Sequence, residues 1–290
     1  MENIIEIRNV TKKYGKHIAI ENINLKINKG EVYGFIGPNG AGKSTTIKCI
    51  MDLVNKNVGE IYIDGKLIKR SNTKLKEKIG YLPSEIHLYD DLTVKQMIEY
   101  SNSFYSKDCM EKANDLIKRL EIDEKKKIEE LSLGNLKKVG IVLALMHNPE
   151  IIIMDEATSG LDPLMQEVFY EIINKEKKEG KTIFFSSHIL SEIKRICDKV
   201  AIIKNGKIIK VDDIENLNNS NLMKIKIESD DIEKIKKELS LENITQNKNE
   251  IEFVYEDINE LISKLSKFKL TKVLISELDI EEIFMHYYKN

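Results

Sequence analysis

The stretch Gly37-Pro38-Asn39-Gly40-Ala41-Gly42-Lys43-Ser44 fits the pattern G-x-x-x-x-G-K-[ST] at every required position. In this pattern the glycines let the loop bend so that successive backbone N–H groups point at a β-phosphate. The ammonium of Lys43 then reaches the β- and γ-phosphates, and the hydroxyl of Ser44 coordinates Mg²⁺. Residues 31–36 read as a buried strand entering the loop, and residues 45–51 as a helix leaving it, with its N-terminus towards the anion. Strand, loop and helix in this order predict a site for a nucleoside triphosphate.

The composition narrows the class of protein and its partners. The length of 290 residues suits one large domain and a small one. Lys and Arg number 46 against 48 Asp and Glu, so the net charge of −2 provides no global field, and we expect no nucleic-acid partner. Cys49, Cys109 and Cys197 match no metal or disulfide spacing and are expected to be reduced and buried. The apolar runs are too short to span a bilayer, so we expect a soluble protein that acts at a membrane only through a partner.

The pattern of apolar residues divides the chain into two domains. An α/β domain is expected over residues 1–215, with a helical part at about 92–145. The Asn- and Ser-rich residues 216–221 read as a linker. Residues 222–290 follow the order β-α-β-β-α-β, with a last helix at 280–288, which predicts a small α+β domain of ferredoxin-like arrangement.

Polar residues follow two further apolar runs that read as central strands. Asp155 and Glu156 end the run 151–154, where an acid can hold Mg²⁺ and its neighbour can polarise an attacking water. His188 follows the buried run 182–186, where a neutral imidazole can sense a γ-phosphate. A lone histidine is more often structural, but ligands bind such sheets at the carboxyl ends of the strands, which favours a functional role.

A second anion-binding element is expected at residues 131–135, Leu-Ser-Leu-Gly-Asn, which precede a helix over 136–146. Ser132 and the following backbone N–H groups lie at the N-terminus of that helix. Many helices begin with serine, so the element gains its meaning from its position just before the Asp155 strand.

Together these residues resemble the ATP-binding subunit of an ABC transporter, and the resemblance covers residues 1–215. It implies a P-loop ABC ATPase fold with a mixed sheet, a helical subdomain and an N-terminal antiparallel part. It implies that ATP and Mg²⁺ are the ligands and that Tyr14 stacks on adenine, although a packing tyrosine is an alternative. The ATP-binding residues that it implies are Tyr14, Gly37, Pro38, Asn39, Gly40, Ala41, Gly42, Lys43, Ser44 and Thr45.

The same resemblance implies roles for residues outside the phosphate loop. Glu156 corresponds to the catalytic glutamate and His188 to the switch histidine, while Ser44 and, through water, Asp155 correspond to the metal site. The remaining positions are Ser132 and Gly134 of the signature sequence, which act on the other subunit's ATP, and Ser159, Gly160, Leu161 and Asp162 of the D-loop.

Three departures from the family pattern stand out. Ser84 and Glu85 replace the usual Gln in the loop that couples the metal site to the membrane partner, so Glu85 or a water is expected to substitute. Leu133 replaces the first glycine of the signature, and Ala157 replaces a common proline after the catalytic glutamate. ATP hydrolysis is still expected because the phosphate-loop lysine, the two acids and the histidine are present.

The resemblance implies a pair of ATPase subunits, identical or related, that closes over ATP and opens after hydrolysis. The nearest branch is the drug- and antibiotic-exporting one, including the bacitracin-resistance group, in which a separate chain forms the membrane permease. We therefore expect a cytoplasmic subunit held at the inner face of the cell membrane by the permease. Two alternatives remain: a soluble ABC ATPase with a non-transport partner, such as an iron–sulfur assembly complex, and a nucleotide sensor that does not hydrolyse ATP.

Overall fold

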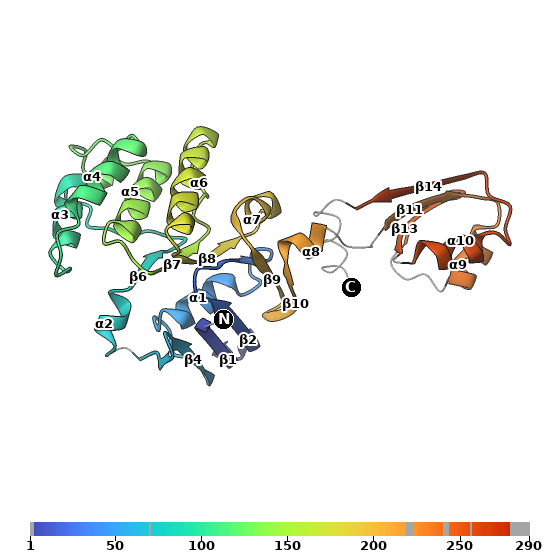
Figure 1. The fold of residues 1–290 in the computed structure, drawn as a ribbon, viewed down its shortest axis with the longest axis horizontal. Helices are drawn as coiled ribbons and strands as arrows, with labels where there is room; N and C mark the ends of the chain where they lie inside the picture. The colour runs from blue at the N-terminus through green and yellow to red at the C-terminus, as the bar shows by residue number, and fades with distance from the viewer. Residues whose placement is uncertain (1–2, 70, 219–222, 240–243, 256, 279–290) are drawn as a thin grey trace. The chain divides into compact units, whose positions relative to one another are not determined.

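The computed structural model shows two compact units, residues 1–211 and residues 212–290 (Figure 1). The structure describes residues 3–69, 71–218, 223–239, 244–255 and 257–278. Within these residues, no helix combines the length and the apolar character needed to cross a membrane.

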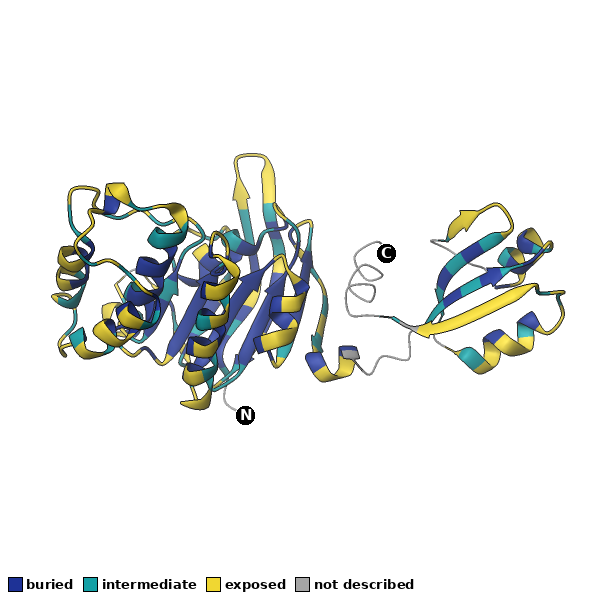
Figure 2. Ribbon diagram, turned by 90° about the horizontal axis from the view of Figure 1, so that it is seen from above, coloured by how far each residue is buried: buried dark blue, intermediate teal, exposed yellow. Residues whose placement is uncertain are grey.

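A six-stranded sheet forms the centre of the first unit, in the order β10-β9-β3-β8-β7-β6. Strands β6, β7, β8, β3 and β9 run parallel to one another. Buried residues follow these strands, while the outer faces of the helices are exposed (Figure 2). The strand bounds are β3 Val32–Ile36, β6 Ile79–Leu82, β7 Ile151–Asp155, β8 Thr182–Ser187, β9 Lys199–Lys204 and β10 Lys207–Asp213. Every residue of β3, β7 and β8 is buried, as a parallel sheet covered on both faces requires.

Helices follow the strands and pack on this sheet: α1 (Lys43–Ile50) contacts β7, and α7 (Leu190–Ile196) contacts β3 and β8. The short helix α2 spans Thr73–Lys76. Helix α6 (Pro163–Lys178) begins directly after Asp162, whose side chain caps it by accepting from Met165 N, and Pro163 takes its first position.

A second, antiparallel sheet in the order β2-β1-β4-β5 forms the N-terminal part of this unit. Its strands are β1 Asn3–Tyr14, β2 His17–Asn28, β4 Val58–Ile63 and β5 Lys66–Leu67. Alternate isoleucines of β1 and β4, including Ile5 and Ile63, are fully or almost fully buried in one core shared with the larger sheet. The arrangement positions the β1–β2 hairpin beside the phosphate loop, since Gly206 N–H bonds to Ala41 O and Glu21 N–H bonds to Gly206 O.

The helical part contains α3 (Val94–Asn102), α4 (Met110–Arg119), the 3₁₀ turn η1 (Ile128–Glu130) and α5 (Leu133–Leu145). Helix α3 begins with a capping box, in which Thr93 accepts from Gln96 N and the Gln96 side chain accepts from Thr93 N. Helix α5 starts at Leu133, three residues before the expected start. The Ser132 hydroxyl caps the helix by accepting a hydrogen bond from Asn135 N–H at 3.3 Å. Gly134 therefore lies inside the first turn of α5 and not in a loop ahead of it.

The second unit contains a four-stranded antiparallel sheet in the order β12-β13-β11-β14, as in ferredoxin-like folds. Its apolar residues, led by Ile225, Ile227 and Phe253, form a separate core with the helices. The bounds are β11 Met223–Glu228, α9 Ile232–Leu239, β12 Thr245–Asn247, β13 Glu250–Tyr255, α10 Ile258–Leu265 and β14 Lys272–Glu277. The expected last helix at 280–288 lies outside the described residues.

The expected linker 216–221 begins inside a helix, because α8 spans Ile214–Asn218. Ile214 and Leu217, three residues apart on one helix face, are buried at 6% and 5% exposure, and this burial holds the segment in a helix despite its Asn-rich composition. Residues 219–222 lie outside the described part of the chain.

Candidate ATP-binding site

The loop between β3 and α1 has room only for glycine at positions 37 and 42. Gly42 adopts φ 109°, and a Cβ atom there would lie 2.6 Å from Ile20 Cγ2 and 2.9 Å from Ala19 O. At Gly37, a Cβ atom would lie 2.4 Å from Ile203 O. Any side chain at these positions would displace the backbone of neighbouring strands, so the two outer glycines of the motif are required by packing.

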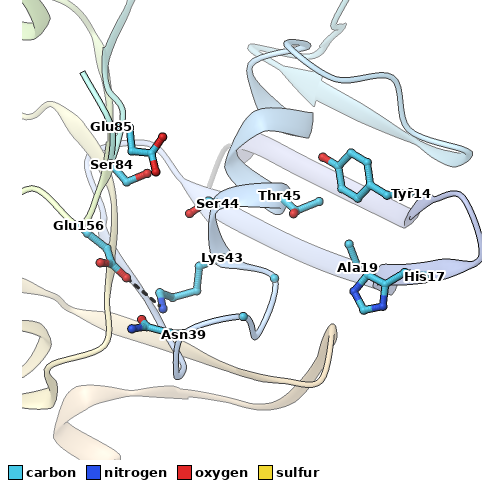
Figure 3. Close-up of a pocket in the computed structure, with 12 residues that line it drawn as sticks. Tyr14, His17, Ala19, Asn39, Lys43, Ser44, Thr45, Ser84, Glu85 and Glu156 are labelled. Atoms are coloured by element: carbon cyan, nitrogen blue, oxygen red, sulfur yellow. Dashed lines mark ion pairs between the residues drawn. The ribbon is translucent and has the colours of Figure 1, made fainter. Parts of the chain in front are cut away.

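Lys43 holds its charge at the centre of this loop. It is only 4% exposed, and its Nζ donates to Gly37 O at 2.7 Å and to Pro38 O at 3.2 Å. The same Nζ lies 3.2 Å from Glu156 Oε1, an ion pair visible in Figure 3. The lysine that is expected to bind phosphates and the glutamate that is expected to activate water are therefore in direct contact.

Glu156 is fixed by its backbone as well as by its side chain. It adopts φ 49°, in the left-handed region that a non-glycine residue rarely occupies. Its N–H donates to Ser186 O at 3.2 Å and lies 3.2 Å from Ser186 Oγ. Its Oε1 also lies 3.4 Å from His188 Nδ1, so one carboxylate oxygen contacts both the lysine and the predicted switch histidine. Strained residues of this kind concentrate at functional sites.

Asp155, the preceding residue, is buried at 1% exposure at the end of β7. Its Oδ1 accepts a 2.5 Å hydrogen bond from Ser186 Oγ, whereas its Oδ2 is buried and has no hydrogen-bond partner. A buried carboxylate oxygen without a donor is costly unless a cation or water satisfies it. Within the described residues there is no cluster of three or more His, Cys, Asp or Glu that could hold a metal by itself. A single free carboxylate oxygen fits Mg²⁺, which takes one or two carboxylates and completes its shell with water and substrate phosphates.

A cavity of about 550 Å³ opens beside the loop (Figure 3). It is lined by Tyr14, His17, Ala19, Asn39, Gly40, Gly42, Lys43, Ser44, Thr45, Ser84, Glu85 and Glu156. Ten of the predicted residues thus meet at one cavity, whereas Gly37, Pro38, Ala41, Asp155 and His188 are not among its lining residues.

Tyr14 and His17 lie at one end of this cavity, and Ser84, Glu85 and Glu156 lie at the other (Figure 3). Tyr14 is 47% exposed, and Lys12 Nζ lies 4.7 Å from the centroid of its ring. Tyr14 is therefore not a core-packing residue. His17 is not among the residues that were predicted from the sequence to form the site. The sequence feature that could have identified His17 is the turn at Gly15-Lys16, because this turn pairs Tyr14 with His17 across the β1–β2 hairpin.

Lys137 is a second residue that sequence analysis missed. It lies on α5, is 4% exposed, and its Nζ donates to Ser84 O at 2.9 Å and to Pro83 O at 3.4 Å. Burial lowers the pKa of Lys137, and the nearby negative charges of Asp155 and Glu156 oppose that shift. The lysine anchors the backbone of the loop in which Ser84 and Glu85 replace glutamine.

The predicted signature and D-loop residues meet each other away from the cavity. A Cβ atom at Gly134 would lie 2.5 Å from Gly160 O, so the first turn of α5 packs directly on the D-loop backbone. Leu133, next to it, is 82% exposed. Neither Ser132 nor Gly134 is among the described residues that line the cavity.

Known proteins have sequences similar to that of this chain. The family model described as "ABC transporter" matches residues 20–159. A Linearmycin resistance ATP-binding protein of Bacillus subtilis is 36% identical over 72% of this chain and 68% of its own length. A Bacitracin transport ATP-binding protein of Bacillus licheniformis is 33% identical over 76% of this chain and 73% of its own length.

A solved structure agrees with these relatives. A dimeric ATP-binding cassette in a post-hydrolysis state with ADP and Pi superposes with a TM-score of 0.65 at 28% identity, over 72% of this chain and 98% of that one. The expected fold and ATPase activity are thereby confirmed, and the relatives favour a transport subunit over a soluble ABC ATPase with a non-transport partner. The chain belongs to the ABC transporter family, as an ATP-binding subunit with ATPase activity.

Proposed function

We propose that a pair of these subunits closes over ATP and powers the export of antibiotics or related compounds through a separate membrane permease. The relatives with linearmycin and bacitracin in their names support the substrate class, and the dimeric neighbour supports the pair. The subunit would lie at the cytoplasmic face of the membrane, held there by the permease. The contact of Glu156 with both Lys43 and His188, beside the phosphate loop, is the observation that carries the catalytic part of this proposal.

Mg²⁺ fits the residues at the phosphate end of the cavity. Ser44 at the start of α1 and the unpartnered Oδ2 of Asp155 are hard oxygen donors, and Asp155 would act directly or through water. The ion would neutralise charge on the β- and γ-phosphates during transfer. Glu85 lines the same cavity and supplies a carboxylate where the family has glutamine.

The chain's own residues then divide the work of hydrolysis. Lys43 would exchange its contacts with Gly37 O and Glu156 for phosphate oxygens, which frees the Glu156 carboxylate to accept a proton from water. His188 would hydrogen-bond the γ-phosphate and hold Glu156 in place through Nδ1. Tyr14 and His17 would contact the base at the far end. Ser132 and Gly134 of one subunit, with the D-loop, would cover the ATP of the other.

The variant Glu156→Gln tests the catalytic assignment. We expect turnover to fall by at least about 100-fold, because the general base is lost, while ATP still binds. The measurable consequence is an ATP-stabilised dimer on size-exclusion chromatography that the wild type shows only transiently. Glu171→Gln, a change at an exposed position of α6, is the matched control. Wild-type turnover in Glu156→Gln would contradict the role of this glutamate.

Co-purification from the native membrane tests the transport assignment. The tagged subunit, extracted in mild detergent, is expected to carry a polytopic membrane protein. Mass spectrometry of the same complex would show whether the second ATPase subunit is identical or related. Recovery only with soluble assembly factors would overturn the transport role and leave the ATPase chemistry in place.

A further inference from the structure

Glu192 is a buried carboxylate to which the proposed mechanism gives no role. It lies in the first turn of α7 and is 5% exposed. Three hydroxyl groups donate to it: Thr158 Oγ1 to Oε1 at 2.5 Å, Ser187 Oγ to Oε2 at 2.5 Å, and Tyr170 OH to Oε1 at 3.3 Å. A buried carboxylate is tolerated when hydrogen bonds satisfy its oxygens, and here both oxygens are engaged.

The two short hydrogen bonds come from the segment that follows Glu156 and from the segment that precedes His188. Thr158 is the last residue before the D-loop, and it lies two residues after Glu156. Ser187 directly precedes His188, and its oxygen also accepts from Ile189 N–H at 2.9 Å. The Ser187 side chain therefore spans the backbone of His188 while its proton is directed to Glu192. One carboxylate thus ties the beginning of the D-loop to the backbone that carries the histidine.

These groups also line one cavity. A cavity of about 220 Å³ is lined by Glu156, Thr158, Ser187, His188 and Glu192, among others. A shift of the Glu192 side chain would consequently change the walls around the catalytic glutamate and histidine. Groups that hold a reacting side chain within a few tenths of an ångström influence the chemical step more than substrate binding.

We infer that Glu192 is a positioning residue for ATP hydrolysis, which fixes the D-loop segment and the His188 segment relative to each other around Glu156. The inference rests on the roles proposed for Glu156 and His188. Because the D-loop faces the second subunit in the proposed pair, the same carboxylate connects the state of one site with the contact made to the other. Tyr170, whose hydroxyl donates to Glu192, also carries the Arg195 guanidinium 4.2 Å from its ring centroid.

The test compares Glu192→Leu with Glu192→Gln in the full-length subunit. Leu removes both acceptor oxygens. The Gln amide keeps one acceptor oxygen and can donate from its nitrogen to the hydroxyl on the other side. We expect kcat per ATP-binding subunit to fall by about tenfold or more in the Leu variant, with KM for ATP within about twofold of the wild type. Gln is expected to restore kcat to within about threefold. Turnover is normalised to subunits that bind a fluorescent ATP analogue, so that loss of folded protein does not imitate the effect.

Three further variants make the result decisive. Glu171→Leu, at a position with 74% side-chain exposure, controls for the loss of a charge on a neighbouring helix. Ser187→Ala removes one donor and is expected to lower kcat, with an effect that is not additive with that of Glu192→Leu. Wild-type kcat in Glu192→Leu, or a loss that Gln does not restore, would overturn the positioning role. His188→Ala separates the two hypotheses: if it retains wild-type turnover, the proposed role of the histidine fails, and not only that of Glu192.

Discussion

The hydroxyl of Ser186 donates a 2.5 Å hydrogen bond to Oδ1 of Asp155, and both side chains are almost completely buried. This bond commits one carboxylate oxygen to the neighbouring strand and orients the other, Oδ2, which has no hydrogen-bond partner. A serine at this position of β8 therefore decides which oxygen is available to a cation. The orientation of this carboxylate is therefore set by the sheet, before any cation binds at the proposed site.

Asp155→Asn should weaken the binding of the divalent cation in the presence of ATP. The substitution keeps the side-chain shape but removes the negative charge and places a donor amide towards the cation or towards Ser186. We expect the affinity for Mn²⁺, measured by electron paramagnetic resonance with a non-hydrolysable ATP analogue, to fall by about 10- to 100-fold. Asp64→Asn, at a partly exposed ion pair with Lys78, is the control. Equal affinity in the two variants would show that Asp155 does not serve the metal.

Gly134→Ala should separate ATP binding from turnover. The added Cβ atom would lie 2.5 Å from Gly160 O, so either α5 or the D-loop has to move. The cavity of the same subunit does not include this contact, so the Kd of the isolated subunit for ATP, measured by fluorescence titration, should stay within about twofold. Turnover, which in the proposed pair needs both segments at the second subunit's ATP, should fall by about tenfold or more. Gly180→Ala, where nothing lies within 4 Å of the added atom although φ is positive, controls for a change of glycine alone.

His17→Ala should raise KM for ATP without changing kcat. His17 lines the cavity beside Tyr14, at the end opposite to Glu156 (Figure 3), so in the proposed site its contacts would act on the base and not on the reacting phosphate. We expect KM to rise by about two- to tenfold, in a steady-state assay with varied ATP. His87→Ala removes an exposed imidazole that does not line the cavity and should leave KM unchanged. A fall in kcat instead of a rise in KM would place His17 in the chemical step.

The parts of the site that were predicted from sequence are those in which a local pattern determines the geometry. The phosphate loop, the Asp155–Glu156 pair and His188 all follow continuous apolar strands, and the parallel sheet brings their ends together. The α/β core was predictable for the same reason. The bounds of the helices were less predictable: α5 begins earlier than its apolar periodicity suggested, because the cap Ser132 precedes the residues that show this periodicity.

The residues that were missed are set by contacts distant in sequence. Lys137 reaches carbonyl groups more than 50 residues earlier in the chain, and Glu192 accepts from Thr158, 34 residues earlier. A lysine or glutamate on a helix has no local signature that distinguishes it from a solvated one. Only the packing of α5 against the Ser84 loop, and of α7 against β8, buries these charges.

His147 makes the stability of the first unit depend on pH. Burial, with smaller contributions from the positive charges of Lys112 and Lys181, lowers the pKa of His147 to about 4 against a hydrogen bond with Ile79 O. Because the folded pKa lies below the unfolded value of about 6.5, the unfolded chain binds more protons between these values. Stability is therefore full above pH 6.5 and is lost as the pH falls towards 4.

His147→Phe should remove this dependence. The phenyl ring can keep the stacking on Tyr105, whose ring centroid lies 4.3 Å from that of the imidazole, but it cannot be protonated. Between pH 8 and pH 5 we expect the wild type to lose about 2 kcal/mol of unfolding free energy more than the variant. Urea unfolding at both pH values measures the difference, and at pH 8 the variant should be less stable by about 1 kcal/mol through the lost hydrogen bond. Parallel losses in both proteins would show that His147 is protonated in the folded state at pH 5, and that burial does not hold it neutral.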